Sequence, residues 1–121
     1  MRAILLIDHG SREDDANRVV EDVAALLREA HEGQIIVAAH MELAAPNIAE
    51  GVAACVALGA REVIAVPYFL GPGRHASRDV PRMVADAAAE HVGVRTRVSE
   101  PLGAHAKIAE LIALRVGLAS E

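Results

Sequence analysis

The chain has 121 residues, the length of one domain, and we expect a single domain over 1–121. Hydrophobic residues make up 53% of it and aromatic residues only 2%, so the core is aliphatic and the base-stacking side chains of single-stranded nucleic-acid binders are scarce. The net charge of −5 further disfavours contact with a phosphate backbone, so we expect no nucleic-acid partner. The one cysteine, Cys55, excludes an internal disulfide and a four-cysteine iron–sulfur site within one chain.

The N-terminus carries no visible targeting signal. After Arg2 the chain enters an apolar run and soon meets Asp8, unlike a signal peptide. No apolar run approaches the length that spans a membrane. We therefore expect a cytoplasmic protein without a membrane partner.

The first two predicted strands are continuously apolar runs at 3–7 and 35–39, which is typical of strands covered on both faces. Between them, apolar residues over 19–30 recur at helical spacing after a candidate cap at Asp14 or Asp15. The chain therefore begins with a strand, a helix and a second strand.

A second predicted helix opens at Pro46 and Asn47 and closes at Gly59. Cys55 lies on its apolar stripe, where a small core residue is expected. The third predicted strand covers 62–68.

A loop over 70–78, rich in glycine, proline and arginine, follows the third strand. Asp79 or Ser77 can cap the third helix, with Pro81 tolerated in its first turn. A fourth, weaker strand over 94–98 alternates apolar and polar residues, as an edge strand does.

A last helix over 105–116 completes a strict alternation of strands and helices. This order predicts an α/β fold, a doubly wound four-stranded parallel sheet with helices on both faces and right-handed crossovers. A common strand order places the first strand between the second and the third, so that a crevice opens where the chain reverses direction. His9 and His75 would then flank this crevice from opposite walls.

His9 opens the turn His9-Gly10-Ser11-Arg12 at the end of the first strand. Gly10 allows a close backbone approach, and Ser11 and Arg12 offer a hydroxyl and a planar cation suited to carboxylates. Imidazole is a common metal ligand and a near-neutral base. An ordinary loop with a histidine bonded to a carbonyl is the alternative, and the second histidine at the same sheet edge favours a site for a divalent metal.

The 70–78 loop has two glycines around a proline, which can turn N–H groups inward. Arg74, Arg78 and Arg82 place three cations near one helix start, beside Asp79. We interpret this patch as steering anions, although Arg78 and Arg82 also fit an ordinary solvated face.

Three further residues follow predicted strands. Glu42 can act as a general base or a weak metal ligand, or lie on the surface as a plain carboxylate. His40 fits a third ligand or a histidine bonded to the backbone, and His105 fits a helix start or the rim of the site. The phosphate-binding, dinucleotide, serine-hydrolase and zinc-protease motifs are absent, so we expect no nucleotide.

Asp-His-Gly-Ser-Arg at 8–12, Met-Glu-Leu-Ala-Ala-Pro at 41–46 and Pro-Tyr-Phe-Leu-Gly-Pro-Gly-Arg-His-Ala-Ser-Arg-Asp-Val-Pro at 67–81 are the most distinctive segments. Together they resemble the small sirohydrochlorin chelatases, the class II chelatases of the short CbiX and SirB types. Glu-Pro-Leu-Gly-Ala-His at 100–105 is similar to the SirB branch of plants and cyanobacteria. The resemblance runs over nearly the whole chain.

This resemblance implies insertion of cobalt, iron or nickel into sirohydrochlorin without ATP, toward cobalamin, siroheme or related tetrapyrroles. It implies that His9 is a catalytic residue and metal ligand, that His75 is the second metal ligand, and that 70–75 bind the tetrapyrrole. Ala45 falls where some relatives carry a substrate-contacting glutamate, so that contact is made here by backbone or not at all. The predicted substrate-binding residues are Ser11, Arg12, Ala45, Leu70, Gly71, Pro72, Gly73, Arg74 and His75.

Larger relatives hold two copies of this domain in one chain. A chain with a single copy resembles the short form, which pairs as a homodimer. Plant relatives add a cysteine-bearing iron–sulfur tail, and with Cys55 as the one cysteine we expect no cluster here.

Metal insertion requires two pyrrole N–H protons to leave and one divalent cation to enter. We expect neutral His9 and His75 to hold the metal over the ring, Glu42 to relay protons, and Arg12 or Arg74 to bind the substrate's carboxylates. A non-catalytic metal or tetrapyrrole carrier using the same pocket stays open as an alternative, as does a pseudoenzyme that pairs with a larger relative. The ligand types do not choose between cobalt, iron and nickel.

Overall fold

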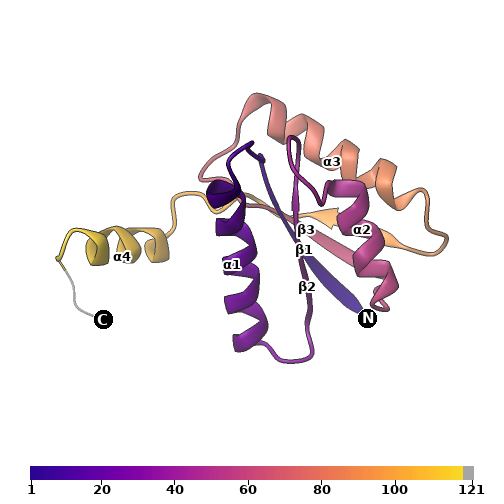
Figure 1. Cartoon of the computed structure of the whole chain (residues 1–121), viewed down its shortest axis with the longest axis horizontal. Helices are drawn as coiled ribbons and strands as arrows, with labels where there is room; N and C mark the ends of the chain where they lie inside the picture. The colour runs from indigo at the N-terminus through magenta and orange to yellow at the C-terminus, as the bar shows by residue number, and fades with distance from the viewer. Residues whose placement is uncertain (119–121) are drawn as a thin grey trace.

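The sheet has the predicted topology. The computed structural model describes residues 1–118, and the side chains of all of these except 74–77. Four parallel strands lie in the order β2-β1-β3-β4, with β1 in the centre of the sheet as expected (Figure 1). The strands are β1 (Arg2–Asp8), β2 (Ile35–His40), β3 (Glu62–Pro67) and β4 (Arg95–Val98).

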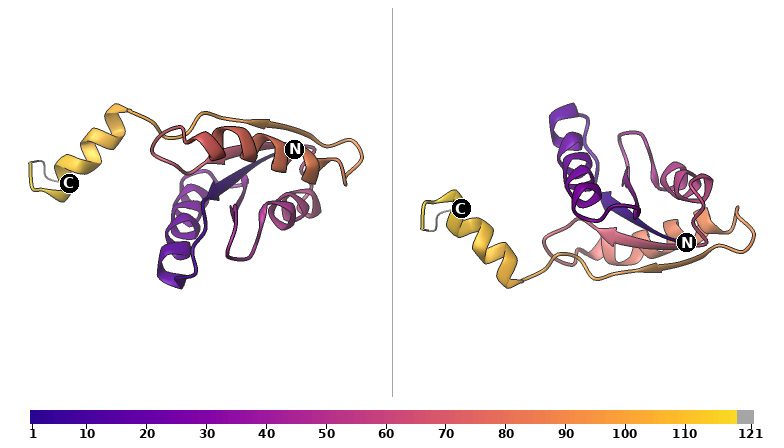
Figure 2. Two further views of the ribbon diagram at one scale, coloured as in Figure 1. Left: turned by 90° about the horizontal axis from the view of Figure 1, so that it is seen from above. Right: turned by 90° about the horizontal axis from the view of Figure 1, so that it is seen from below.

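Helices cover both faces of this sheet, which confirms the predicted doubly wound α/β fold. α2 and α3 pack together on one face, and α1 packs over β1 and β2 on the other (Figures 1 and 2). The helices are α1 (Asp14–Ala30), α2 (Ile48–Ala57), α3 (Arg74–Ala88) and α4 (Ala106–Arg115). In the part of the chain that the structure describes, no helix is long and apolar enough to cross a membrane.

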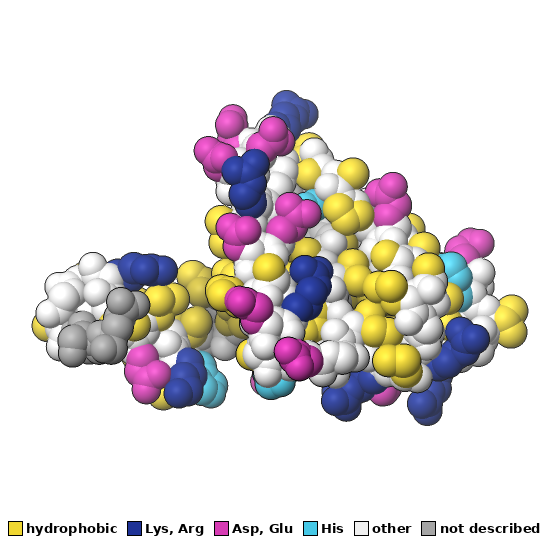
Figure 3. All heavy atoms as spheres, turned by 60° about the horizontal axis from the view of Figure 1, so that its bottom comes forward, with side chains coloured by type: hydrophobic (Ala, Val, Ile, Leu, Met, Phe, Trp, Pro, Cys, Tyr) yellow, Lys and Arg dark blue, Asp and Glu magenta, His cyan; other side chains and the backbone are white. Residues whose placement is uncertain are grey.

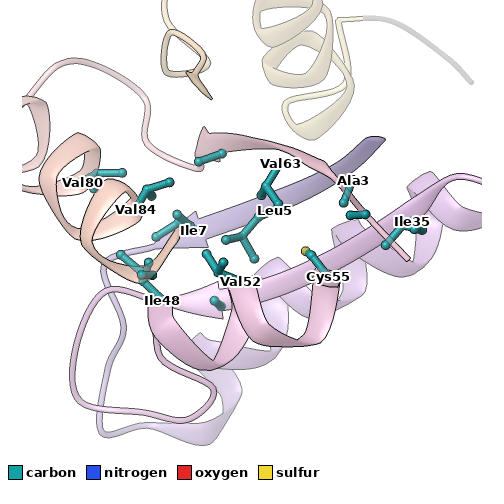
Figure 4. Close-up of a cluster of buried hydrophobic side chains, with 14 of the residues drawn as sticks. Ala3, Leu5, Ile7, Ile35, Ile48, Val52, Cys55, Val63, Val80 and Val84 are labelled. Atoms are coloured by element: carbon teal, nitrogen blue, oxygen red, sulfur yellow. The ribbon is translucent and has the colours of Figure 1, made fainter. Parts of the chain in front are cut away.

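The core is aliphatic and divided by the sheet. Because successive strand residues point to opposite faces, Leu5 and Ile7 of β1 join the larger cluster, while Leu6 joins the smaller one under α1. Figure 4 shows Leu5 and Ile7 packed against Val52 of α2 and Val84 of α3. This burial on both faces explains why β1 reads as a continuous apolar run.

The start of α2 is fixed by a capping box. The Asn47 side chain accepts a hydrogen bond from the Glu50 N–H at 2.8 Å, and the Glu50 carboxylate accepts one from the Asn47 N–H at 2.8 Å. This confirms the predicted helix start. It also anchors the far end of the loop that follows β2.

Two predicted helix starts are wrong. α1 begins at Asp14 with Glu13 as its N-cap, so Asp14 and Asp15 lie in the first turn, where their charges favour the helix dipole. α3 begins at Arg74 rather than after Ser77 or Asp79, so Pro81 lies in the helix interior. Pro81 gives up one backbone hydrogen bond there, and the burial of Val80 and Val84 on either side of it holds the helix together.

α4 stands apart from the rest of the molecule. It begins after His105, whose Nδ1 accepts a hydrogen bond from the Lys107 N–H at 3.0 Å, which confirms His105 as a helix-start residue. None of the described residues of α4 is buried. Both the side and top views show this helix projecting away from the sheet (Figures 1 and 2).

Cys55 is the buried core residue that its position on the α2 stripe predicts. Burial raises the pKa of its thiol to about 11, so the thiol stays protonated near neutral pH. We expect iodoacetamide to label Cys55 in the folded protein at pH 8 at least about a hundredfold more slowly than in urea. Mass spectrometry over a time course measures both rates. Equal rates would show that the thiol is accessible in the folded chain.

Candidate active site

The end of β1 is held from both sides and presents His9 at the carboxyl edge of the sheet. The Ile7 carbonyl accepts a hydrogen bond from Tyr68 N–H at 2.7 Å, and the Asp8 carbonyl accepts one from Met41 N–H at 2.9 Å. The His9 carbonyl accepts one from Glu42 N–H at 3.1 Å, which ties two of the predicted catalytic residues together through their backbones. Both the His9 and the Glu42 residues are exposed.

The His9 ring stacks on Phe69. The two ring centroids lie 4.1 Å apart with 20° between their planes. Phe69 itself is buried, so it gives the exposed imidazole a fixed apolar support. Position along the strand predicts where His9 lies, but it does not reveal this support.

An apolar cavity of about 230 Å³ lies beside Phe69. Pro72 and Gly73, two of the predicted substrate-binding residues, line it. Its other lining residues are Pro67, Phe69, Pro81, Val98, Ser99 and Pro101. Such a surface suits the flat hydrocarbon part of a ligand.

A second, polar cavity of about 330 Å³ brings together three more predicted substrate-binding residues, Ser11, Arg12 and Ala45. The rest of its lining comprises Asp14, Asn17, Arg18, Glu21, His40, Leu43 and Ala44. Arg12 and Arg18 give this cavity the cations that a carboxylate needs, and Asp14 and Glu21 oppose them. Leu70 and Gly71, also predicted to bind substrate, are exposed in the loop after β3 and line neither cavity.

The loop that carries His9 is fixed by Asn17 of α1. Asn17 accepts a hydrogen bond from Ser11 N–H at 2.9 Å and donates one to the Ser11 carbonyl at 2.7 Å. The Ser11 hydroxyl accepts a further bond from Glu13 N–H at 3.0 Å. Asn17 is buried, and sequence reasoning missed it because a single polar residue on a helix gives no such signal.

Gly10 makes the closest backbone approach in the site. Its φ of +88° lies in the left-handed region, and a Cβ added there would lie 1.8 Å from the Glu42 carbonyl oxygen. The loops after β1 and β2 therefore touch through a position that has no room for a side chain.

Asp8, the residue before His9, forms a pair with the buried His40. The His40 Nδ1 and the Asp8 carboxylate are 2.6 Å apart, and only 1% of the His40 side chain is exposed. The register of the sheet explains the pair, since Asp8 and His40 are direct partners at the ends of β1 and β2. The ring is thus bonded to a carboxylate and not, as one of the two alternatives for His40 expected, to the backbone.

We expect His40→Ala to lower the free energy of unfolding by about 2–3 kcal/mol, because it leaves the Asp8 carboxylate without its partner and opens a cavity. His105→Ala is the matched control: it removes one exposed helix cap and costs about 1 kcal/mol. Urea denaturation of both variants measures the difference. Equal losses would show that the Asp8–His40 bond adds nothing to stability.

The residue after Glu42 has an unusual backbone. Leu43 has a φ of 70°, in the left-handed region, although it is not glycine and its side chain is half exposed. Backbone strain of this kind clusters at functional sites. It therefore supports a functional reading of the loop that carries Glu42.

His75 lies on the first turn of α3, not in a loop, and its side chain and that of Arg74 fall outside the described residues. The predicted His9–His75 pair therefore stays a prediction. Among the described side chains, no cluster of three or more histidine, cysteine, aspartate and glutamate residues is placed to hold a metal. Arg82 of the predicted cationic patch lies 3.3 Å from the Asp79 carboxylate.

The similarity of this chain to known proteins points to one family. The CbiX family model matches residues 3–119. The chain is 38% identical to the chloroplastic sirohydrochlorin ferrochelatase of Arabidopsis thaliana, over 93% of this chain and 50% of that protein. It is 30% identical to the sirohydrochlorin cobaltochelatase of Methanopyrus kandleri, over 96% of this chain and 95% of that protein.

The structure superposes on SirB from Bacillus subtilis with Fe³⁺, with a TM-score of 0.85 and 26% identity, over 99% of this chain and 48% of that one. The chain thus spans about half the length of the Arabidopsis and Bacillus proteins. On the family match and these likenesses, the chain belongs to the CbiX family of sirohydrochlorin chelatase homologues.

Proposed function

We propose that this protein catalyses the ATP-independent insertion of a divalent metal, cobalt or iron, into sirohydrochlorin. The observation that carries the proposal is the exposed His9, stacked on Phe69 and linked through its backbone to Glu42. The names of the similar proteins supply the substrate and the two metals. The metal is a substrate of this reaction.

The reaction exchanges one cation for two protons. One divalent metal enters the ring while the two pyrrole N–H groups each release a proton. A neutral imidazole suits both tasks, because it can bind the metal before transfer and accept a proton after it. His9 takes these roles in our proposal, with His75 as the second ligand and Glu42 as the proton relay.

The two cavities suit the two parts of the substrate. The apolar cavity beside Phe69, with Pro72 and Gly73 in its wall, faces the macrocycle. The polar cavity, with Ser11, Arg12 and Ala45 in its wall, takes one of the carboxylates. His9 is positioned by elements that contribute to both cavities, so a ring placed across the edge of the sheet reaches it.

The absorbance change on metal insertion tests the proposal. With sirohydrochlorin and Co²⁺ or Fe²⁺ in excess over the protein, we expect many turnovers per chain and a rate well above that of the uncatalysed reaction. A carrier would bind one equivalent and leave the rate unchanged, which would contradict the proposal. Adding the metals in competition in one assay ranks them.

We also propose that the active form is a homodimer. Relatives that match this chain along nearly their whole length exist beside relatives of twice the length. Two copies of this chain would supply the length of one such longer protein.

A further inference from the structure

The described part of the chain buries two polar residues, and both line the polar cavity of the candidate site. These residues are Asn17 and His40. Figure 3 shows charged side chains spread over one face of the molecule, where water solvates them, whereas His40 is only 1% exposed. A buried polar group costs free energy unless it is hydrogen-bonded, and an apolar side chain of similar size avoids that cost. The position of both residues beside the site therefore points to a role beyond packing.

The side chain of His40 joins the end of β2 to the end of β1. Its Nδ1 lies 2.6 Å from a carboxylate oxygen of Asp8. An ionised carboxylate only accepts hydrogen bonds, so Nδ1 carries a proton and donates it to this bond, which holds the ring in one orientation. His9 follows Asp8 directly, so the bond also restrains the backbone from which the His9 ring projects.

Main-chain hydrogen bonds continue this pairing beyond the two strands. Met41 N–H donates to the Asp8 carbonyl at 2.9 Å, and Glu42 N–H donates to the His9 carbonyl at 3.1 Å. The bond between the Asp8 and His40 side chains therefore lies directly before the residues that carry the two proposed catalytic groups. Without it, only main-chain bonds at the open end of the sheet would set the position of Glu42 relative to His9.

His40 also closes the loop that carries Glu42. Its backbone N–H donates to the Pro46 carbonyl at 2.8 Å, and it forms an isolated bridge with Asn47. Asn47 in turn caps α2, which packs against the core. Both ends of the loop therefore meet at His40, which connects it to the strand before His9 and to the start of α2.

The loop between these two ends has a backbone that needs such an anchor. Leu43 has a φ of 70°, and strained conformations of this kind persist only where the surrounding structure holds them. The Glu42 carbonyl oxygen, directly before Leu43, is the atom that Gly10 approaches most closely. Releasing one end of the loop would let this backbone relax and would move Glu42 away from its place beside His9.

We propose that His40, held by Asp8, is a positioning residue for metal insertion, because it sets where Glu42 and His9 lie relative to each other. This role rests on the proposed function, in which His9 binds the metal and Glu42 relays protons. His40 acts through the backbone of the two loops. A direct contact with substrate is the competing role, since His40 also lines the polar cavity, and the experiment distinguishes the two.

Two substitutions of His40 differ in whether the bond to Asp8 survives. Asparagine carries a side-chain N–H as many bonds from the backbone as Nδ1, so His40→Asn keeps the donor, whereas His40→Leu fills similar space without one. We expect His40→Leu to lower kcat for metal insertion at least about tenfold, with KM changed less than about twofold, and His40→Asn to recover most of that loss. The absorbance assay gives both constants. An unchanged kcat in His40→Leu, or no recovery in His40→Asn, would overturn the proposal.

Ile35→Ala is the matched control for lost stability. Ile35 is buried in β2 at the opposite end of the strand from His40, so its truncation destabilises the fold away from the site. Its kcat is expected to match that of the unchanged protein, with circular dichroism confirming that every variant is folded in the assay. An equal loss of kcat in Ile35→Ala and His40→Leu would overturn the proposal in favour of a purely structural role. A raised KM with unchanged kcat in His40→Leu would overturn it in favour of a contact with substrate.

A spectroscopic measurement separates this role from the proposed function. The His9 ring stacks on Phe69, so the ring current of Phe69 shifts the NMR signals of the His9 ring protons. Without substrate or metal, we expect these signals to move toward their unfolded positions in His40→Leu and to stay in place in His40→Asn and Ile35→Ala. This pattern in a protein without turnover would refute the proposed function and leave the positioning of His9 by His40 standing. Unmoved His9 signals in His40→Leu would overturn the positioning role whatever the turnover.

Discussion

Replacing His9 with alanine is expected to lower the rate of metal insertion into sirohydrochlorin at least about a hundredfold and to leave the fold intact. The ring is exposed and stacks on Phe69, so its loss removes the proposed metal ligand and proton acceptor without opening the core. The measurement is the initial rate followed by absorbance, with urea denaturation as the check on folding. We expect His75→Ala to lower the rate by a similar factor.

His31→Ala is the matched control for both changes. His31 is exposed and follows the last residue of α1, outside the loops that carry the candidate site. It caps α1 through its backbone N–H, and alanine keeps this hydrogen bond. Its rate is expected to match that of the unchanged protein. A His9→Ala protein as fast as the His31→Ala protein would remove His9 from the mechanism.

Gly10→Ala is expected to lower the free energy of unfolding by about 3 kcal/mol or more and to abolish metal insertion. The new Cβ would lie 1.8 Å from the Glu42 carbonyl oxygen and 3.2 Å from the His40 Cβ, so the loops after β1 and β2 have to separate. That movement breaks the hydrogen bond between Glu42 and His9 that sets their relative positions. Urea denaturation and the absorbance assay measure the two effects.

Gly33→Ala separates the steric effect from the backbone effect. Gly33 has a similar positive φ of +84°, but an added Cβ meets nothing within 4 Å. Gly33→Ala is expected to lower the free energy of unfolding by about 1 kcal/mol, the cost of the left-handed conformation alone, and to keep full activity. If Gly10→Ala cost no more than Gly33→Ala, the contact between the two loops would have no role in the site.

The strands and helices could be predicted because each is marked by a pattern of residues that are close together in the sequence. The run at 35–39 is apolar throughout, and β2 covers Ile35–His40. Asn47 and Glu50 have capping-box spacing, and α2 begins where this spacing indicates. His9 could be placed at the edge of the sheet because it follows the end of the first apolar run. In open α/β sheets, ligands bind at the carboxyl ends of the strands.

The contacts that hold the site could not be predicted because they depend on register and depth. The Asp8–His40 bond forms since both residues end neighbouring parallel strands and are direct partners there. The sequence did contain one indication of this bond, because an acidic residue ends one predicted strand and a histidine ends the next. The stacking of His9 on Phe69 links two loops and leaves no comparable pattern.

The predicted start of α3 lies too far along the chain because the turn-forming residues Gly71, Pro72 and Gly73 directly precede the helix. Gly73 is the N-cap, and the helix continues through Pro81, which usually marks an early turn. The burial of Val80 and Val84 against the sheet outweighs the lost hydrogen bond. Similarly, the apolar pattern of 105–116 predicts a helix but does not reveal that α4 projects away from the sheet (Figure 1).

The central position of β1 has a consequence for how the chain folds as it is made. The first strand to leave the ribosome is the innermost one, and Ala3 pairs with both Ile35 and Val63. One edge of β1 therefore stays unpaired until β3, which ends at Pro67, has been synthesised, and exposed edges of apolar strands are prone to aggregate. His9 follows this strand directly, so the sheet edge that carries the candidate site takes shape late, when β3 pairs with β1.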